Sequence, residues 1–417
     1  MAGPSTWWST PSRPESHFTA DELARSAAYH RPLRRAGVAG VGAKLGLLVL
    51  AGLLAPILAS LVDGRSAWDS GVGLVEAVTS ARVLLGTGLT VVALRLPAVL
   101  VDGWFEYRFR RGIPGYRPLP LPSFVTTATA LAIGGWVVLV PIAGVGYRYA
   151  ANDDGWPMMA VAVFIGVVVV VAAGERAVRQ LLPGAESPLE ADSPVADELA
   201  GLVDQFGLAG IGFRVGSAGG RDRDAAPNSA AAGANACAVG VGRNRRVVVT
   251  EALLAEEHST RRFIVAHELT HLTRRHVVLR AGAAVLSAGL TGVVLVALAQ
   301  AGLPWRWFDI PAADPIGLPI LALVVMVVAG LLAPITAWLS RAHERTADTG
   351  AIAAVGPLDP DPARDLHLGS VADLDPPWWA KLYAQHPPPA ERLEYLSRHR
   401  RAVGSSGAMS KPAAISG

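Results

Sequence analysis

Six long apolar runs dominate the sequence and constrain its fold more than any other feature. A helix needs roughly 20 consecutive apolar residues to cross the hydrocarbon core of a bilayer. The composition agrees, because 51% of the 417 residues are hydrophobic and only 17% are charged, which is too apolar for an ordinary soluble protein. The sequence therefore predicts a polytopic, mainly α-helical membrane protein with about six transmembrane helices. The runs lie near 37–62, 80–101, 123–146, 157–182, 277–302 and 316–339.

Arginine residues are concentrated in alternate connections between these runs. They occur in the N-terminal arm 1–36, between the second and third runs, and in the long stretch between the fourth and fifth runs. The other connections, near 63–79, 147–156 and 303–315, carry few basic residues beside several Asp. Cytoplasmic loops of membrane proteins carry an excess of Arg and Lys. We therefore expect both termini and the long central stretch to be cytoplasmic.

The predicted spans divide the chain into membrane and soluble parts. In the arm, Thr19 and Glu22 form a capping box, which predicts a short helix. Two helices of a hairpin return the chain to the side that it left, so the two soluble portions can meet on one face. The expected order is a cytoplasmic arm over 1–36, four transmembrane helices over 37–182, a soluble portion over 183–276, a transmembrane hairpin over 277–339, a second soluble portion over 340–402 and a disordered tail over 403–417.

Charge and cysteine content exclude several classes of protein. The net charge is only +3, and the basic residues form no concentrated face, so we expect no nucleic-acid partner. The single cysteine, Cys237, excludes an intramolecular disulfide and a multi-cysteine metal site. We expect Cys237 to be a small buried residue rather than a nucleophile, because no Cys/His pairing is visible. Any metal ion must be held by His and carboxylate side chains.

Residues 267–271 read HELTH and match the H-E-x-x-H pattern. On a helix, His267 and His271 lie one turn apart on the same face, so both imidazoles can reach one ion, while Glu268 is close enough to act as a base. The alternative is a polar helix face with two unrelated histidines. A catalytic zinc needs a third protein ligand. Val277 stands where the third histidine of a metzincin would fall, so that class is excluded.

A second segment offers the third ligand. Residues 340–352 read SRAHERTADTGAI, in which Glu344 and Asp348 are separated by one helical turn. A returning hairpin brings this helix to the side of the first, so Glu344 can complete the zinc site and Asp348 can accept the free N–H of a ligand histidine. Alone, such an acidic pair usually faces solvent. Together with HELTH, it favours a zinc site.

Three motifs together, HELTHLTRRH, SRAHERTAD and HPPPAERLEYL, resemble the signatures of one integral-membrane metallopeptidase family. This is the gluzincin family that includes the type I CAAX prenyl protease and the HtpX heat-shock protease. The resemblance implies a cytoplasmic, zincin-like α/β metallopeptidase domain that binds one zinc ion per chain. It implies that the three zinc ligands are His267, His271 and Glu344. It also implies that Glu268 is the catalytic base and that Asp348 supports a ligand histidine.

The resemblance extends to the segment ANACAVG at 234–240. In the family the corresponding segment is an edge strand that binds extended substrate, which implies substrate contacts at Asn235 and Ala236. Two positions depart from the family pattern. Thr270 replaces a Gly, which we expect to crowd its helix against a neighbour, and Cys237 replaces an aromatic residue.

His386 and Arg392, in the third motif, each have two possible roles. His386 can donate a hydrogen bond to the oxyanion of the tetrahedral intermediate, and Arg392 can bind a substrate carbonyl or carboxylate. Alternatively, His-Pro-Pro only ends one segment and begins a helix, and Arg392 pairs with a neighbouring acid. The resemblance favours a catalytic His386. His276 receives no role, because a continuous helix would carry it away from the metal face.

The sequence thus predicts a membrane-embedded zinc metalloendopeptidase that acts at the cytoplasmic face. Its expected partners are the lipid bilayer and polypeptide substrates, chiefly membrane or membrane-associated proteins. One alternative is CAAX-type processing of prenylated proteins, which Thr270, Cys237 and six rather than seven spans make less favoured. Another is a membrane sensor that contains a metallopeptidase domain, although the outer loops are short for a sensor. An inactive scaffold conflicts with the complete set of ligands.

Overall fold

The computed structural model describes residues 13–24, 26–27, 187–190, 192–216, 235–240, 242–301, 318–359, 374, 376 and 378–408. The four transmembrane helices predicted over 37–182 lie outside these residues. Contacts divide the chain into two compact units. One comprises residues 32–181 and 281–333, and the other comprises residues 1–31, 182–280 and 334–417. The second of these units contains every site residue discussed below.

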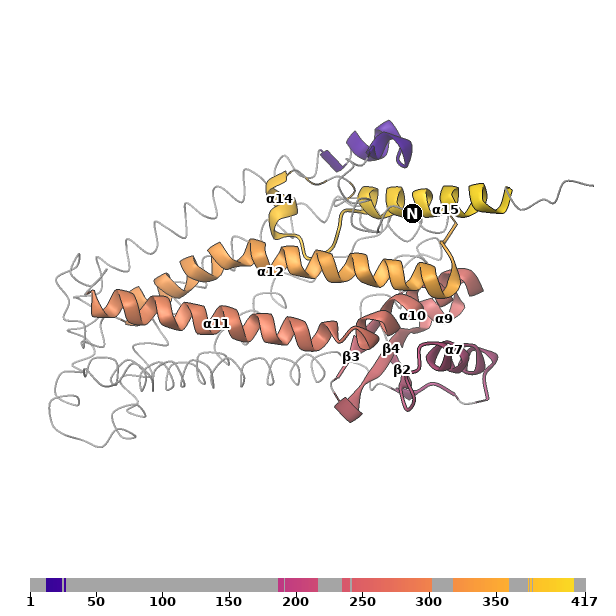
Figure 1. The fold of residues 1–417 in the computed structure, drawn as a ribbon, viewed down its shortest axis with the longest axis horizontal. Coiled ribbons are helices and arrows are strands. Elements are labelled where there is room, and N and C mark those ends of the chain that lie inside the picture. The colour runs from indigo at the N-terminus through magenta and orange to yellow at the C-terminus, as the bar shows by residue number, and fades with distance from the viewer. Residues whose placement is uncertain are drawn as a thin grey trace, which may run out of the picture. The chain divides into compact units, whose positions relative to one another are not determined.

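A four-stranded mixed sheet forms one layer of this unit (Figure 1). β2 and β4 are parallel, while β1 pairs antiparallel with β2 and β3 pairs antiparallel with β4. Val247 and Val249 of β4 are buried on one face of the sheet, as the alternation of a strand requires. β3 lies at the edge, so the predicted edge strand is confirmed. In spatial order the strands are β1 (Ser187–Pro188), β2 (Gly212–Gly216), β4 (Arg246–Thr250) and β3 (Ala236–Val239).

Three helices pack with the sheet, namely α7 (Pro194–Gln205), α9 (Glu251–Ala255) and α10 (His258–Thr273). The side chain of Ser193 caps α7 by accepting the N–H of Ala196, and Thr250 caps α9 in the same way. α10 contacts β3, β4 and α7. Their shared core includes Leu199, Leu202, Leu253, Val265 and Leu269, and burying each such side chain contributes about 1.5–3 kcal/mol. This core fixes α10 on the sheet.

A second core joins distant parts of the chain. It brings Phe18 of the arm together with Phe263 of α10, Ile352 of α12 (Leu318–Val355) and Leu396 of α15 (Pro389–Ala408). The predicted capping box is confirmed, because the N–H of Thr19 donates to Glu22 Oε2 at 2.8 Å and the N–H of Glu22 donates to Thr19 Oγ1 at 3.3 Å. Further elements are η2 (Pro14–Ser16), η4 (Gly242–Asn244) and α14 (Trp378–Tyr383). α15 continues six residues into the segment 403–417 that was expected to be disordered.

The fifth apolar run lies within α11 (His276–Gln300) apart from its last two residues, and the sixth lies within α12 apart from its first two residues. Among the described residues, one helical segment, His276–Val294, is long and apolar enough to cross a membrane, with a mean hydropathy of 1.8. Several of its large apolar side chains are exposed, including Leu286 and Val293. For the described residues the structure therefore confirms a mainly helical fold with a small mixed sheet, while six transmembrane helices remain a prediction.

Candidate metal centre and active site

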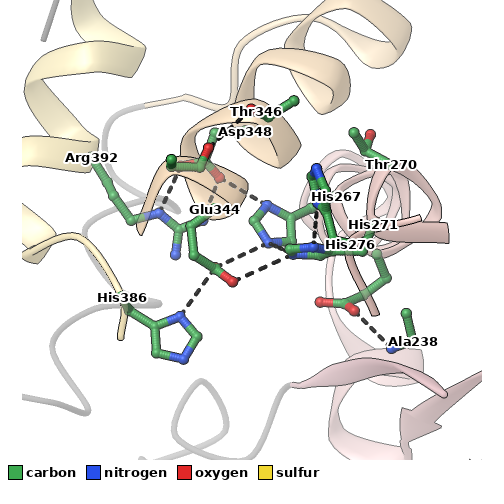
Figure 2. A network of polar contacts seen from close by, with 12 residues as sticks. Ala238, His267, Thr270, His271, His276, Glu344, Thr346, Asp348, His386 and Arg392 are labelled. Carbon is green, nitrogen blue, oxygen red and sulfur yellow. Dashed lines mark hydrogen bonds and ion pairs between the residues drawn. The ribbon is translucent and has the colours of Figure 1, made fainter. Parts of the chain in front are cut away.

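Helices α10 and α12 bring together the three side chains that the sequence predicts as zinc ligands (Figure 2). The Nε2 atoms of His267 and His271 are 3.2 Å apart, as expected for residues one turn apart on a helix face. Each Nε2 lies 3.4 Å from a carboxylate oxygen of Glu344. All three residues are buried. Two imidazole nitrogens and one carboxylate are a donor set that suits zinc, so the residues present fit the implied metal.

Glu268 belongs to the same cluster, since its carboxylate and the imidazoles of His267 and His271 offer ligand atoms within 4.8 Å of one another. The N–H of Ala238, on edge strand β3, donates to Glu268 Oε2 at 2.7 Å. Burial raises the pKa of the Glu268 carboxyl above its ordinary value, although His267 and the Ala238 N–H oppose this shift. A carboxyl with a raised pKa is suited to exchanging protons near neutral pH.

A charged pair supports the outer nitrogen of His267. Asp348 Oδ1 lies 2.9 Å from His267 Nδ1, and Arg392 donates to both oxygens of Asp348, with Nε at 2.9 Å from Oδ2. Burial alone would lower the pKa of His267, but its hydrogen bonds to Asp348 and Glu344 raise it from 6.5 to about 9. Burial would raise the pKa of Asp348, but Arg392 and His267 hold it well below its usual range.

This arrangement bears on the two roles considered for Arg392. Its guanidinium donates hydrogen bonds to Asp348. This agrees with the alternative role, in which Arg392 pairs with a neighbouring acid. A bidentate pair of this kind is strong and directional. Contact of Arg392 with a substrate stays a prediction.

A second, uncharged arrangement supports His271. Its Nδ1 lies 2.9 Å from Nδ1 of His276, the first residue of α11. Burial and the neighbouring His267 lower the pKa of His271 to about 3, so this imidazole is neutral. Sequence reasoning gave His276 no role because it assumed one continuous helix. Instead, α10 ends at Thr273, and Arg275 takes a left-handed conformation with φ of 56°, which turns His276 back toward His271.

His386 lies next to the same carboxylate. Its Nδ1 is 3.0 Å from Glu344 Oε2, and its side chain is 68% exposed. Burial would raise the pKa of Glu344, but hydrogen bonds from His267 and His386 hold it far below its usual range. The third motif therefore reaches the cluster of imidazoles and carboxylates, and a catalytic role for His386 stays a prediction.

The edge strand passes the site through Ala238. The N–H and C=O groups of Asn235 are bonded to Thr250 at the end of β4, so they point into the sheet. Backbone groups alternate along a strand, which directs those of Ala236 and Ala238 to the open edge. The expectation that Cys237 is buried was wrong. Its side chain is exposed, because it stands on the face opposite to that of buried Ala236.

Thr270 meets α12 at a glycine. Its hydroxyl donates to the carbonyl of Ala266 at 2.8 Å, and its side chain lies against Gly350. A β-carbon at Gly350 would approach Thr270 Cγ2 to 2.6 Å. The expected crowding is therefore confirmed as a close contact, and the absence of a side chain at Gly350 accommodates it.

Comparison with known proteins agrees with this geometry. Residues 221–400 match the family model described as Peptidase family M48, a range that includes both helices of the candidate metal centre, β3 and the third motif. Among curated proteins, no match to the chain was found. The resemblance predicted from the three motifs is confirmed for this part of the chain. Residues 221–400 are therefore a zinc metalloendopeptidase domain of peptidase family M48.

Proposed function

We propose that the chain is a membrane-embedded zinc metalloendopeptidase in which His267, His271 and Glu344 hold one zinc ion. The observation that carries this proposal is the approach of both Nε2 atoms and the Glu344 carboxylate to within 3.4 Å of each other. Two helices far apart in the sequence supply these groups. Catalytic zinc sites use three such protein ligands and leave one position open.

Glu268 is the general base and acid of the proposed reaction. When bound, zinc acts as a Lewis acid that lowers the pKa of a water to about 7 and polarises the substrate carbonyl. Glu268 takes a proton from the attacking water as the water oxygen bonds to the carbonyl carbon. It then gives this proton to the amide nitrogen as the C–N bond breaks, so Glu268 ends unchanged. The raised pKa of its carboxyl supports both transfers.

His386, Asp348 and Arg392 assist in this proposal. His386 donates a hydrogen bond to the oxyanion of the tetrahedral intermediate, and its exposed ring beside Glu344 supports this role. Asp348 accepts the Nδ1–H of His267 and thereby keeps Nε2 directed at the metal. Arg392 fixes Asp348; direct contact of Arg392 with a substrate has less support.

The substrate is an extended polypeptide that pairs with the open edge of β3. Asn235 and Ala236 begin this edge, and backbone groups at Ala236 and Ala238 point away from β4. Recognition through backbone hydrogen bonds depends little on side chains, which suits broad selectivity.

Membrane proteins and membrane-associated proteins are the proposed substrates, cleaved at the cytoplasmic face. The apolar segment His276–Val294 begins three residues after α10 ends, which supports a site close to a bilayer. The distribution of Arg supports a cytoplasmic orientation of both termini and the site. Quality-control cleavage of unfolded segments is favoured over processing of prenylated proteins.

Metal analysis and peptidase assays test the catalytic assignment. We expect Glu268→Gln to retain one zinc per chain and to lose activity, since the ligands remain but the base is absent. His267→Ala and Glu344→Ala should lose stoichiometric zinc. Glu257→Gln, at the exposed start of α10, is the matched control and should change neither property. Normal activity of Glu268→Gln would overturn the mechanism.

A second assay tests the substrate class. Purified enzyme is offered a farnesylated CAAX peptide and, separately, a destabilised membrane protein. We expect cleavage of the membrane protein and slow cleavage of the peptide with no dependence on the farnesyl group. Efficient farnesyl-dependent cleavage of the peptide, with the membrane protein left intact, would instead support CAAX processing.

A further inference from the structure

The two histidine ligands differ in what holds their outer nitrogen. His267 Nδ1 faces Asp348, which is itself bonded to Arg392. His271 Nδ1 faces the imidazole of His276 at 2.9 Å. Among the described residues, no carboxylate is recorded at His271 Nδ1. A ligand histidine generally needs an outer partner that fixes its tautomer and ring orientation, so this asymmetry directs attention to His276.

The turn between α10 and α11 places His276 at this position. α10 ends at Thr273, and α11 begins only three residues later at His276. The reversal depends on Arg275, whose φ of 56° makes it the one non-glycine residue with positive φ in the described part of the chain. That conformation costs roughly 1 kcal/mol for a residue with a side chain. Because this unfavourable conformation brings His276 to Nδ1 of His271, it supports a role for His276 at the proposed metal centre.

His276 is itself held in place. It is 3% exposed, and its ring is stacked on that of His343 of α12, with centroids 4.3 Å apart and planes inclined by 9°. His343 is also buried, and its Nδ1 has no hydrogen-bond partner among the residues that the structure describes. Three helices thus contribute one histidine each to a continuous row, His271, His276 and His343 (Figure 2 labels the first two).

We propose that His276 is the positioning residue of the His271 zinc ligand and that stacking on His343 fixes the ring of His276. This inference rests on the proposed zinc ligands. With Nε2 of His271 directed at the metal, its Nδ1 carries the hydrogen and donates it to the unprotonated Nδ1 of His276. His276 therefore selects the tautomer of His271 that can bind metal through Nε2.

Two substitutions of nearly equal shape test the proposal in the full-length protein. In His276→Asn, the amide oxygen can take the place of Nδ1 as the acceptor, whereas His276→Leu offers no acceptor. Zinc affinity is measured by competition with a chromophoric chelator, and ligand geometry is measured from the visible absorption of the cobalt-substituted protein. We expect His276→Leu to weaken zinc binding about 10- to 100-fold and to alter the cobalt spectrum. We expect His276→Asn to keep both the zinc affinity and the cobalt spectrum close to those of the wild type.

Two outcomes overturn the inference. Either Leu keeps the wild-type affinity and spectrum, or Asn and Leu are impaired equally. If His276→Leu fails to fold when metal-free, His343→Leu and His343→Phe decide instead. Phe keeps a flat ring for stacking and should behave as the wild type, while Leu should weaken zinc binding, and equal behaviour of the two would count against the proposal.

The zinc centre and the role of His276 can fail separately. His271→Ala and Glu344→Ala, assayed in parallel, report on the centre itself. If both retain stoichiometric zinc, the proposed ligand set is wrong. If both lose zinc while His276→Leu binds it as tightly as the wild type, only the positioning role is wrong.

Discussion

The side chain of Thr270 lies directly on the backbone of Gly350, where a β-carbon would come within 2.6 Å of Thr270 Cγ2. This contact fixes how closely α10 and α12 approach each other. It therefore also fixes the distance between the two HELTH imidazoles and Glu344. Thr270 and Gly350 act as one unit, since a larger residue at either position requires a smaller one at the other.

Gly350→Ala should destabilise the protein by about 1–3 kcal/mol, because overpacking forces neighbouring side chains or backbone to shift. Adding Thr270→Ala should recover part of this loss, as expected for residues in contact. Denaturant unfolding of the two single variants and the double variant measures the coupling. Gly201→Ala in α7 is the control, because nothing lies within 4 Å of a β-carbon there. Additive effects of the Thr270 and Gly350 substitutions would contradict the contact.

Arg392→Ala should lower the free energy of unfolding by roughly 3 kcal/mol, because it removes the guanidinium partner of the buried Asp348 carboxylate and leaves only His267 beside it. Zinc affinity should fall as well, since Asp348 then holds His267 less firmly. Adding Asp348→Asn should recover part of the stability. Kinetic assays separate this role from substrate binding. A raised KM with unchanged stability and zinc affinity would favour direct contact of Arg392 with the substrate.

Zinc binding to the metal-free chain should release about one proton near neutral pH. The pKa of His267 is raised to about 9, whereas that of His271 is lowered to about 3. A raised pKa means that His267 keeps its proton below about pH 9 and must lose it when zinc binds. Apparent zinc affinity should therefore rise with pH up to that value and then level off. Calorimetric titration in two buffers with different heats of ionisation counts the protons.

Asp348→Asn provides the control for this pH dependence. It removes the first of the hydrogen bonds that raise the pKa of His267, so the pH at which affinity levels off should move down. An unchanged profile would show that the proton comes from another group.

Cys237 offers a native probe of membrane orientation. It is the single cysteine and is exposed on β3, so a membrane-impermeant maleimide should label it in permeabilised cells and not in intact cells. Partial desolvation of this exposed side chain and the nearby Glu268 raise the pKa of its thiol, so labelling should accelerate as the pH rises. A Cys237→Ser chain is the unlabelled control. In that background, Asp153→Cys should react in intact cells, and labelling of Cys237 from outside would overturn the orientation.

Several features could be predicted from the sequence because they depend on local spacing. The shared face of His267 and His271 follows from helical periodicity, and the capping box of Thr19 and Glu22 follows from a four-residue pattern. The convergence of Glu344 with HELTH followed from a returning hairpin. The edge position of the segment at 234–240 followed from family resemblance rather than from composition.

Other features depend on tertiary contacts that the sequence does not display. At the break after Thr273, an arginine, Arg275, takes the left-handed conformation that glycine usually supplies. Because no glycine marks the break, the sequence suggested a single helix, and the role of His276 was missed. The HELTHLTRRH motif did contain a signal, namely a further histidine five positions after His271. The exposure of Cys237 depends on which face of β3 meets the core, and the pairing of Arg392 with Asp348 depends on how α15 packs.

The hydrogen bond between Ala238 and Glu268 joins recognition to chemistry. One amide hydrogen on the open edge of β3 already serves the carboxylate of the proposed base. A peptide that adds to this edge would compete with Glu268 for that donor. Binding of an extended chain would then take over the N–H of Ala238 and release Glu268 in the same step. Short or folded segments that never reach Ala238 would leave Glu268 bonded to it.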